Sequence, residues 1–247
     1  MSEIELKLPT APSDPIQPKE SVFVWIDILG FSDMIMKADA FDEPVRLRLL
    51  RLRRLFENDE RFHSNIISDG MLLEIAEVHH RGDFRTLIDI FQIIGQKLIE
   101  FILETKCAVR GGISIGTRWT FGTRENDYVS NGLARAYHLE STKVDWPIVA
   151  TTREFLMRLQ AMFRVESSEE FDFSHAFNKS GDDIYFIDFL RPLTDVQMIS
   201  RYSEFIFWAI DQNESKPNVR NKYVWLLKHL AKVKGTPLPV RWQHSII

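Results

Sequence analysis

The stretch that decides the fold is residues 22–31, which reads Val-Phe-Val-Trp-Ile-Asp-Ile-Leu-Gly-Phe. Seven of its first eight residues are apolar, and valine, isoleucine, phenylalanine and tryptophan favour strands. The exception is Asp27, and a glycine turn follows at Gly30. A carboxylate inside an apolar strand is costly unless a cation, a metal ion or backbone donors pair with it. Asp27 is therefore either a strand-end residue bonded to the following turn or a ligand for a cation.

Composition sets the broad class of the protein. The 247 residues allow one large domain or one domain with an appendage, and 45% hydrophobic residues with 18 Phe can bury a sizeable core. The 31 Lys and Arg against 35 Asp and Glu give a net charge of −4, which offers no global support for a nucleic-acid or anionic-membrane surface. The single cysteine, Cys107, lies in an apolar context, which favours a buried core residue over a nucleophile.

The sequence contains no targeting or membrane-spanning pattern. No apolar run approaches the ~20 residues that a membrane span needs. The first residues lack the charged-then-apolar order of a signal peptide. We therefore expect a cytoplasmic protein without a stable membrane anchor.

The first half of the chain predicts a split β-α-β-β-α-β arrangement. Residues 1–20 contain four prolines and little periodicity, which predicts a flexible arm. The elements expected after it are a strand at 22–29, a helix in two pieces to 37 and over 44–56, two hairpin strands at 63–67 and 71–76, a helix at 84–105, and a strand at 108–115 continued over 117–121. This order is typical of ferredoxin-like folds.

The second half predicts further elements packed on that core. The expected elements are a helix at 132–141, a strand at 147–150, a helix opened by Thr151 or Thr152, a strand at 184–189, and helices at 194–213 and 219–233 that end at Gly235. The predicted fold class is α+β, an α/β sandwich with a ferredoxin-like core. The predicted organisation is a flexible arm over 1–20, a core domain over 21–165, and a mostly helical extension over 166–247 packed on the core.

Two carboxylates are expected to meet at one site. Asp69 lies in the turn Ser-Asp-Gly at 68–70, and in a ferredoxin-like sheet this hairpin is a neighbour of the first strand. Asp27 and Asp69 can then reach the same point. Paired carboxylates with open positions suit Mg²⁺ or Mn²⁺, which prefer oxygen ligands and commonly bridge to substrate phosphates. Taken singly, Asp69 is better explained as a turn residue, so the metal site rests on the pair.

Three other patterns are better explained by ordinary structure. Residues 112–116 match the G-x-S-x-G elbow of hydrolases, but Ser114 is predicted inside an apolar strand instead of on an exposed turn. The arginine-rich helix over 44–56 carries leucines between its arginines. This pattern is better explained by an amphipathic helix with one solvated arginine face and one leucine face than by a helix that binds nucleic acid. The pair His79-His80 has no metal-type spacing and favours a surface loop.

Four stretches taken together resemble a known family. Residues 27–31, 68–70, 110–116 and 131–135 occur in this order with spacing that fits the fold. They resemble the class III nucleotidyl cyclases, in which the first strand reads roughly F-x-D-I-x-G-F and an aspartate lies in the following hairpin. In that family a later strand reads R-x-G-I-x-x-G, and N-x-x-x-R opens a helix. The resemblance covers about residues 22–156, so the core over 21–165 would be a class III cyclase-like catalytic domain.

The resemblance implies a phosphorus-oxygen lyase that cyclises a nucleoside triphosphate. The 3′-hydroxyl attacks the α-phosphate and expels pyrophosphate, with two Mn²⁺ or Mg²⁺ ions per site. By motif match, Asp27 and Asp69 hold the metals with help from the backbone carbonyl of Ile28. The remaining residues that match by position are Arg110 for the phosphates, Asn131 and Arg135 for the ribose and the transition state, and Phe31, Asn65, Arg110 and Arg124 for substrate binding.

The resemblance also implies a partner. In the class III cyclases one subunit contributes the metal-holding half of a site and the other contributes the Asn/Arg half. Because this chain carries both halves, the resemblance implies a symmetric homodimer with two composite active sites. No nucleic acid is expected as a partner, and the effector that reads the cyclic product is not expected to bind the enzyme directly.

The base-reading positions depart from the purine cyclases. Those enzymes carry lysine or glutamate four residues before the hairpin aspartate, where this chain has Asn65, and the second base reader falls in the loop containing Arg124. These departures resemble the bacterial pyrimidine cyclases of anti-phage signalling, which make cyclic UMP or cyclic CMP. The sequence favours UTP as substrate, with cytidylate or adenylate/guanylate cyclase as alternatives. A catalytically inactive cyclase-like sensor or dimerisation module and a polymerase-like palm are the rivals from other classes.

Overall fold

The computed structural model of the protein describes residues 18–37, 43–75, 84–120, 128–163, 173–180, 183–191 and 193–235. Within these residues the helices and strands follow in the order β1 (Lys19–Ile28), α1 (Phe31–Lys37), α2 (Glu43–Arg54), β2 (Phe62–Ile67), β3 (Gly70–Ile75), α3 (Phe84–Thr105), β4 (Val109–Thr120), β5 (Tyr128–Ser130), α4 (Asn131–Lys143), β6 (Val149–Thr152), α5 (Arg153–Met162), the 3₁₀ turn η1 (Phe173–His175), β7 (Phe177–Lys179), β8 (Ile184–Ile187), α6 (Val196–Gln212) and α7 (Pro217–Lys234).

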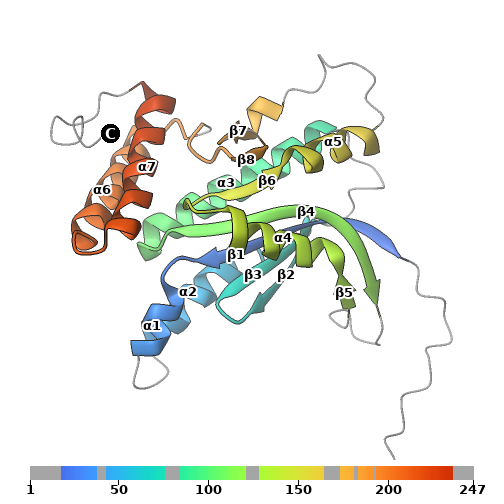
Figure 1. The fold of residues 1–247 in the computed structure, drawn as a ribbon, viewed down its shortest axis with the longest axis horizontal. Helices are drawn as coiled ribbons and strands as arrows, with labels where there is room; N and C mark the ends of the chain where they lie inside the picture. Colours follow the sequence, from blue (N-terminus) through green and yellow to red (C-terminus); the bar gives the residue numbers. More distant parts are fainter. Residues whose placement is uncertain are drawn as a thin grey trace, which may run out of the picture.

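One mixed sheet organises the described part of the chain (Figure 1). Its strand order is β2-β3-β1-β4-β6-β8-β7, and β5 pairs with β4 outside this path. The first four strands are antiparallel to their neighbours, as in a ferredoxin-like β-α-β-β-α-β core. β6 then runs parallel to β4, and β8 and β7 continue the sheet in antiparallel pairs. The predicted α+β class with this core is confirmed.

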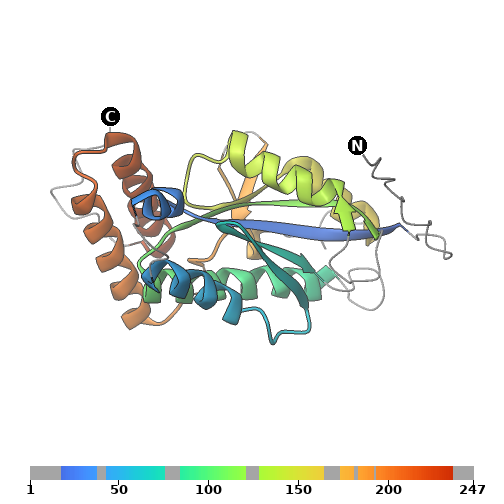
Figure 2. The same ribbon diagram turned by 90° about the horizontal axis from the view of Figure 1, so that it is seen from below.

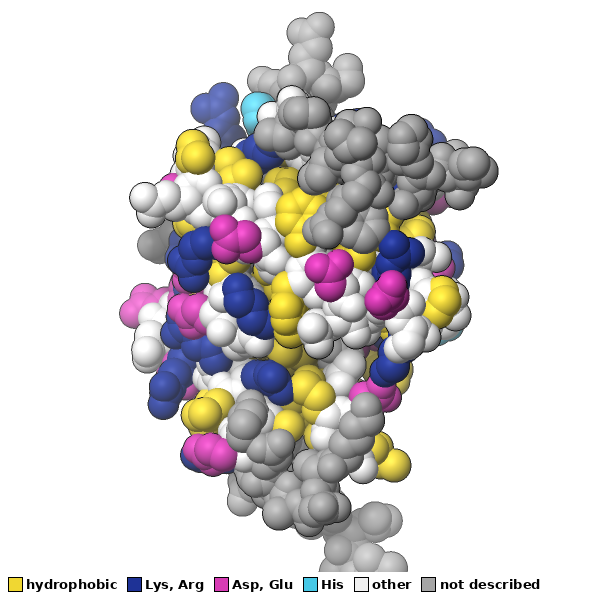
Figure 3. Space-filling view, turned by 90° about the vertical axis from the view of Figure 1, so that its left-hand side faces the viewer, with side chains coloured by type: hydrophobic (Ala, Val, Ile, Leu, Met, Phe, Trp, Pro, Cys, Tyr) yellow, Lys and Arg dark blue, Asp and Glu magenta, His cyan; other side chains and the backbone are white. Residues whose placement is uncertain are grey.

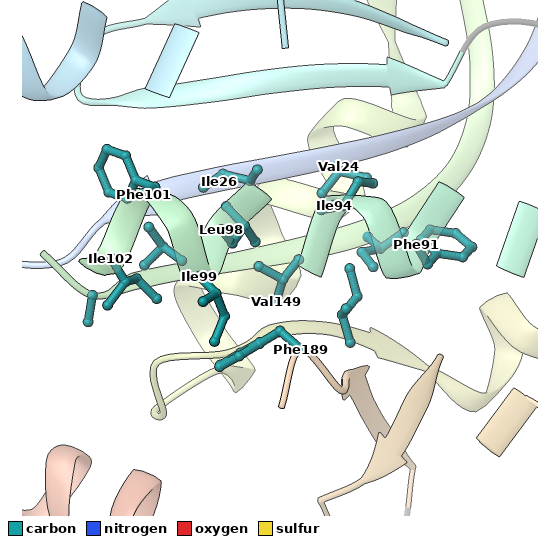
Figure 4. Packing of buried hydrophobic residues seen from close by; sticks show 14 of the residues in the cluster. Val24, Ile26, Phe91, Ile94, Leu98, Ile99, Phe101, Ile102, Val149 and Phe189 are labelled. Carbon is teal, nitrogen blue, oxygen red and sulfur yellow. The ribbon is translucent and has the colours of Figure 1, made fainter. Parts of the chain in front are cut away.

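The alternation of side chains along β1 shows which helices cover each face of the sheet. Val24 and Ile26 lie in the same core cluster as Ile94 and Leu98 of α3 (Figure 4). Phe23 and Trp25 alternate with them and pack instead with Ala136 of α4. α2 and α3 therefore cover one face of the sheet and α4 the other, as Figure 2 shows. By the same alternation, the side chain of the next odd-numbered residue, Asp27, belongs to the α4 face.

Helices α6 and α7 stand at the end of the sheet where β1 stops and α1 begins (Figure 1). Their buried residues, among them Tyr202, Phe205 and Leu227, belong to the same hydrophobic cluster as β1 and α3. Trp225 of α7 also stacks on Trp146, which precedes β6, with ring centroids 5.5 Å apart. On the face seen from this end, Lys and Arg side chains are mixed with Asp and Glu (Figure 3), so no field of one sign dominates it.

The element boundaries differ from the predicted ones in instructive places. β1 begins at Lys19, inside the predicted arm, and β4 is one strand from Val109–Thr120 where two pieces were predicted. β5 and β7, of three residues each, were not predicted because so short a stretch carries no readable periodicity. α7 begins at Pro217, since proline at the first helical position loses no intrahelical bond. The pair His79-His80 lies outside the described residues.

Several local predictions are confirmed. Thr152 caps α5 by accepting a hydrogen bond from the Phe155 backbone amide. Gly235 ends α7 in the left-handed region with φ of 62°. Cys107 is a buried free thiol, and Ser114 lies inside β4 opposite Phe23, not on an exposed turn. In the part of the chain that the structure describes, no helix combines the length and hydropathy that crossing a membrane requires.

Candidate active site

The end of β1 brings Asp27 and Asp69 into one place. Asp27 lies opposite Gly70 of β3 on one side and opposite Arg110 of β4 on the other. Asp69 directly precedes Gly70, and the Ser32 hydroxyl donates to its Oδ2 at 3.1 Å. A Cβ on Gly70 would approach the Trp25 ring to 2.4 Å, so the hairpin can pack this closely against β1 only with glycine there. Local sequence thus sets the position of the carboxylate pair.

The electrostatics at this end of β1 favour the binding of a cation. The pKa of Asp27 is raised to about 7, mainly by burial and further by the carboxylates of Glu140 and Asp69, while Arg110 opposes the shift. A divalent cation between the carboxylates would offset the repulsion that disfavours the ionised form of Asp27. The donors present are all oxygens, which fits Mg²⁺ or Mn²⁺.

These donors are too few to hold a metal alone. In the described residues, no group of three or more His, Cys, Asp and Glu side chains is arranged to hold a metal ion. A site built on Asp27 and Asp69 must therefore take further ligands from a backbone carbonyl such as that of Ile28, from water, or from substrate phosphates. Mg²⁺ sites commonly take most of their ligands from such sources.

Glu140 is a site residue that the sequence analysis missed. It lies on α4 with its side chain 4% exposed, and it forms an ion pair with the Arg110 guanidinium. Arg110 Nη2 also lies 3.7 Å from Asp27 Oδ2, and its Nη1 donates to the Val144 carbonyl at 3.3 Å. Glu140 therefore fixes the guanidinium beside Asp27. Its signal in the sequence is a glutamate on the buried stripe of a helix, four residues after Ala136.

Helix α7 adds a lysine at the same place. Burial and the nearby Arg110 lower the pKa of Lys222, whereas Asp145 and Glu140 act in the opposite direction. A cavity of about 330 Å³ separates this helix from the β1–α1 turn, and Gly30, Asp33, Lys216 and Lys222 are among its lining residues. The extension after residue 165 thus borders the carboxylate site, a juxtaposition that sequence patterns do not reveal.

Asn131 and Arg135 lie on the first turns of α4. Ser130 caps this helix by accepting hydrogen bonds from the backbone amides of Gly132 and Leu133. The Asn131 side-chain oxygen accepts a bond from the Thr117 backbone amide at 2.8 Å. Arg135 is exposed, and its Nη1 lies 3.5 Å from the Ile115 carbonyl.

Strand β4 separates this pair from the carboxylates. Arg110 lies beside Asp27, whereas Thr117, the residue bonded to Asn131, lies seven residues further along the strand. At ~3.3 Å per residue this corresponds to about 23 Å. The structure therefore brings Asp27, Asp69 and Arg110 together, and it places Asn131 and Arg135 apart from them within one chain.

The predicted substrate-binding residues occupy different environments. The amide of Asn65 on β2 bonds to the Tyr128 hydroxyl, and burial raises the Tyr128 pKa to about 12. Arg118 stacks 4.4 Å from the Tyr128 ring and pairs at 2.8 Å with Glu74, so these polar groups form one cluster that the sequence analysis missed. Phe31 is 1% exposed in the core, which leaves only its backbone for a ligand. Arg124 lies outside the described residues.

Comparisons with known proteins find similarity among solved structures only. No protein-family model matches the chain, and no curated protein matches it. Among solved structures it is similar to a bacterial light-regulated adenylyl cyclase, with 14% identity, a TM-score of 0.46, and coverage of 85% of this chain and 60% of that chain. It is also similar to the guanylyl cyclase Cya2, with 12% identity, a TM-score of 0.44, and coverage of 70% and 92%.

A third similar structure is the guanylate cyclase domain of RhGC from Catenaria anguillulae in complex with GTP, with 14% identity, a TM-score of 0.43, and coverage of 69% of this chain and 97% of that chain. The chain thus spans less than two thirds of the adenylyl cyclase it matches. Likenesses at this distance transfer neither an activity nor a residue role to this chain.

The carboxylate pair makes a direct prediction about metal binding. Asp69→Asn is expected to weaken Mn²⁺ binding by at least about 100-fold because it removes one of two charged ligands. The fold should survive, since an amide oxygen can still accept the Ser32 hydroxyl bond. Titration calorimetry with Mn²⁺ measures the affinity, and Asp33→Asn, an exposed carboxylate change at the same end of the sheet, is the matched control. Unchanged Mn²⁺ affinity in Asp69→Asn would contradict the metal assignment.

Proposed function

We propose that the protein is a nucleotidyl cyclase that converts a nucleoside triphosphate into its 3′,5′-cyclic monophosphate and pyrophosphate. The observation that supports this most is the pairing of Asp27 and Asp69 beside Arg110, at one end of β4. The Asn131–Arg135 pair of α4 lies near the other end of β4. Two acidic ligands and an arginine fork suit metal-bound phosphates. An amide and an arginine one helical turn apart suit a ribose and a developing phosphoryl charge.

Each residue has a chemical task in this reaction. The 3′-oxygen forms a bond to the α-phosphorus as the bond to pyrophosphate breaks, and the hydroxyl proton leaves to solvent. Asp27 and Asp69, with the Ile28 carbonyl, would hold two Mg²⁺ or Mn²⁺ ions, which supply charge neutralisation and activate the hydroxyl. Arg110, oriented by Glu140, binds phosphate oxygens as a planar fork.

The Asn131–Arg135 half must come from a second copy of the chain. Along β4, about 23 Å separates the Thr117 contact of Asn131 from the position beside Asp27, and about 17 Å separates the Ile115 contact of Arg135 from it, and each distance is longer than a side chain. A two-fold symmetric dimer solves this, since each chain then lends its α4 pair to the carboxylates of the other. Apolar side chains near α4 support such an interface, because Tyr137, Val129 and Trp119 are 53%, 57% and 37% exposed.

The base is proposed to be a pyrimidine, with UTP favoured over CTP. Asn65 carries no charge and is held by Tyr128, which differs from the lysine or glutamate of the purine-selective relatives. Arg124 offers donors that suit O2 and O4 of uracil. By its resemblance to the pyrimidine cyclases, the enzyme would make a second messenger for antiviral defence. The catalytic domain would span 21–165, and the extension over 166–247 would border the site through Lys222.

A second candidate function is an inactive cyclase-like module that binds nucleotides or dimerises. Two contacts favour an inactive module. Arg110 is already paired with Glu140, and the Asn131 side-chain oxygen already accepts a hydrogen bond from the Thr117 amide. An inactive module needs no free catalytic groups, whereas a cyclase must redirect both side chains toward substrate. Formation of any cyclic nucleotide by the purified protein decides between the two.

Mixing two inactive variants tests the composite site. Asp69→Asn and Arg135→Ala should each abolish cyclisation, and an equal mixture should recover about one quarter of wild-type activity. Random exchange makes half of the dimers mixed, and one of two sites in each is intact. Mixing Asp69→Asn with Asp27→Asn is the control, because both changes affect the same half and should restore nothing. Mixed dimers verified by native mass spectrometry but without turnover would contradict the shared site.

Competition among substrates tests the base. With the four triphosphates at equal concentration, the expected ranking is UTP, then CTP, with ATP and GTP poor. Each unpaired polar group on the base costs about 1–3 kcal/mol. Tyr128→Phe removes the hydroxyl bonded to Asn65 and should reduce the preference for UTP over ATP and GTP. Liquid chromatography with mass detection measures the products. Dominant cyclic AMP or cyclic GMP would refute the pyrimidine assignment and leave the cyclase assignment intact.

A further inference from the structure

A second cavity lies far from the carboxylates, between the sheet edge and helix α7. Its volume is about 570 Å³, within the range of small-molecule sites. We call it the basic cavity, and the residues that line it are Asn178, Lys179, Ser180, Phe186, Arg191, Trp225, Lys228, His229, Lys232, Val233 and Lys234. Its edge strand β7 is four strand positions from β1, about 19 Å across the sheet. The basic cavity is thus a separate place from the candidate active site.

The charge of the basic cavity is one-sided. Five lysine and arginine residues and one histidine line it, and no aspartate or glutamate does. Lys179 reaches it from β7, whereas Lys228 and Lys232 reach it from α7, one helical turn apart. In the described residues, none of these three lysines has an ion pair or side-chain hydrogen bond. Like charges gathered around a concavity leave a positive potential that an anion can satisfy.

A buried carboxylate fixes the walls of the cavity. The Asp188 side chain is fully buried; its Oδ2 accepts from Asn178 Nδ2 at 2.5 Å and lies 3.2 Å from Arg191 Nε, and its Oδ1 lies 3.7 Å from His229 Nε2. All three partners line the basic cavity. Burial opposes ionisation of Asp188, but its bonds to His229 and Arg191 hold its pKa below the usual value. The cavity is therefore preformed, because one ionised group orients three of its lining residues.

The aromatic wall narrows the class of ligand. Trp225 stacks on Trp146, with an interplanar angle of 12°, and on His229, with an interplanar angle of 14°. Because the indole already packs against these two rings, it offers little free surface on which a nucleobase could stack. The lining therefore combines a cluster of positive charges with an apolar edge. Recognition is expected to depend mainly on the anionic part of a ligand.

We propose that the basic cavity binds a polyphosphate group, either free pyrophosphate or the phosphate tail of a nucleotide. Lys179, Lys228 and Lys232 would supply the charge-assisted contacts from two sides, and Arg191 and His229 would form the fixed floor. This binding needs no metal ion and no residue of the candidate active site. It assigns a ligand to the C-terminal extension that is independent of the proposed cyclase reaction.

The test measures pyrophosphate binding to the full-length protein by titration calorimetry in EDTA. EDTA removes the divalent cations that the candidate active site would need, so binding there is suppressed. The wild type is expected to bind one pyrophosphate per chain. The double variant K228E/K232E should bind about 100-fold more weakly, about tenfold for each reversed charge. The control R54E/R201E makes the same charge change at exposed positions outside the cavity and should keep wild-type affinity.

The outcomes separate the proposal from its alternatives. Equal affinity for pyrophosphate, ATP and UTP in EDTA supports recognition of the phosphates alone, and Asp69→Asn should not alter it. Absence of pyrophosphate binding by the wild type would overturn the proposal. Equal weakening in both double variants would also overturn it, because it would reflect net charge only. Circular dichroism and thermal melting establish that each variant is folded. Failure of cyclisation in metal-loaded protein leaves this result unaffected.

Discussion

The arrangement of the candidate site depends on Asp27, a carboxylate at the end of the apolar strand β1. Burying such a group costs free energy unless a partner pairs with it. The alternation along β1 that buries Val24 and Ile26 against α3 turns Asp27 to the α4 face. There it meets Asp69 from the β2–β3 turn and Arg110 from β4, and Glu140 holds Arg110 in place. Burial and the carboxylates of Glu140 and Asp69 disfavour the ionised form of Asp27, so a bound cation is the simplest complement to this group.

The same strand that gathers these groups separates them from Asn131 and Arg135. β4 is long enough to carry Arg110 at one end and the Thr117 contact of Asn131 at the other. The proposed cyclase reaction would therefore need two copies of the chain, each of which lends its Asn131–Arg135 pair to the carboxylates of the other. Helix α7, in the extension after residue 165, contributes residues to both sites. Lys222 lies near Arg110, and Lys228 and Lys232 line the basic cavity further along the helix.

Much of this could be predicted from the sequence because the signals are local. The alternation around Asp27, the Asp-Gly turn and the helical spacing over 84–105 each report on their own segment, and they gave the β-α-β-β-α-β core. The juxtaposition of Asp27 and Asp69 followed from the strand order of that core. Glu140, Tyr128 and Lys222 could not be placed in the same way. Their roles depend on helix and strand packing between distant segments, and short strands such as β7 carry no period of their own.

Direct identification of the reaction product tests the proposed cyclisation of a nucleoside triphosphate at this site. Purified wild-type protein is incubated with UTP and Mn²⁺, and the products are identified by mass and by retention against authentic standards. We expect 3′,5′-cyclic UMP and pyrophosphate in equal amounts, with none formed by Asp27→Asn. Wild-type protein that binds Mn²⁺ and forms dimers, yet makes no cyclic nucleotide from UTP, CTP, ATP or GTP, would show that the protein is not a nucleotidyl cyclase.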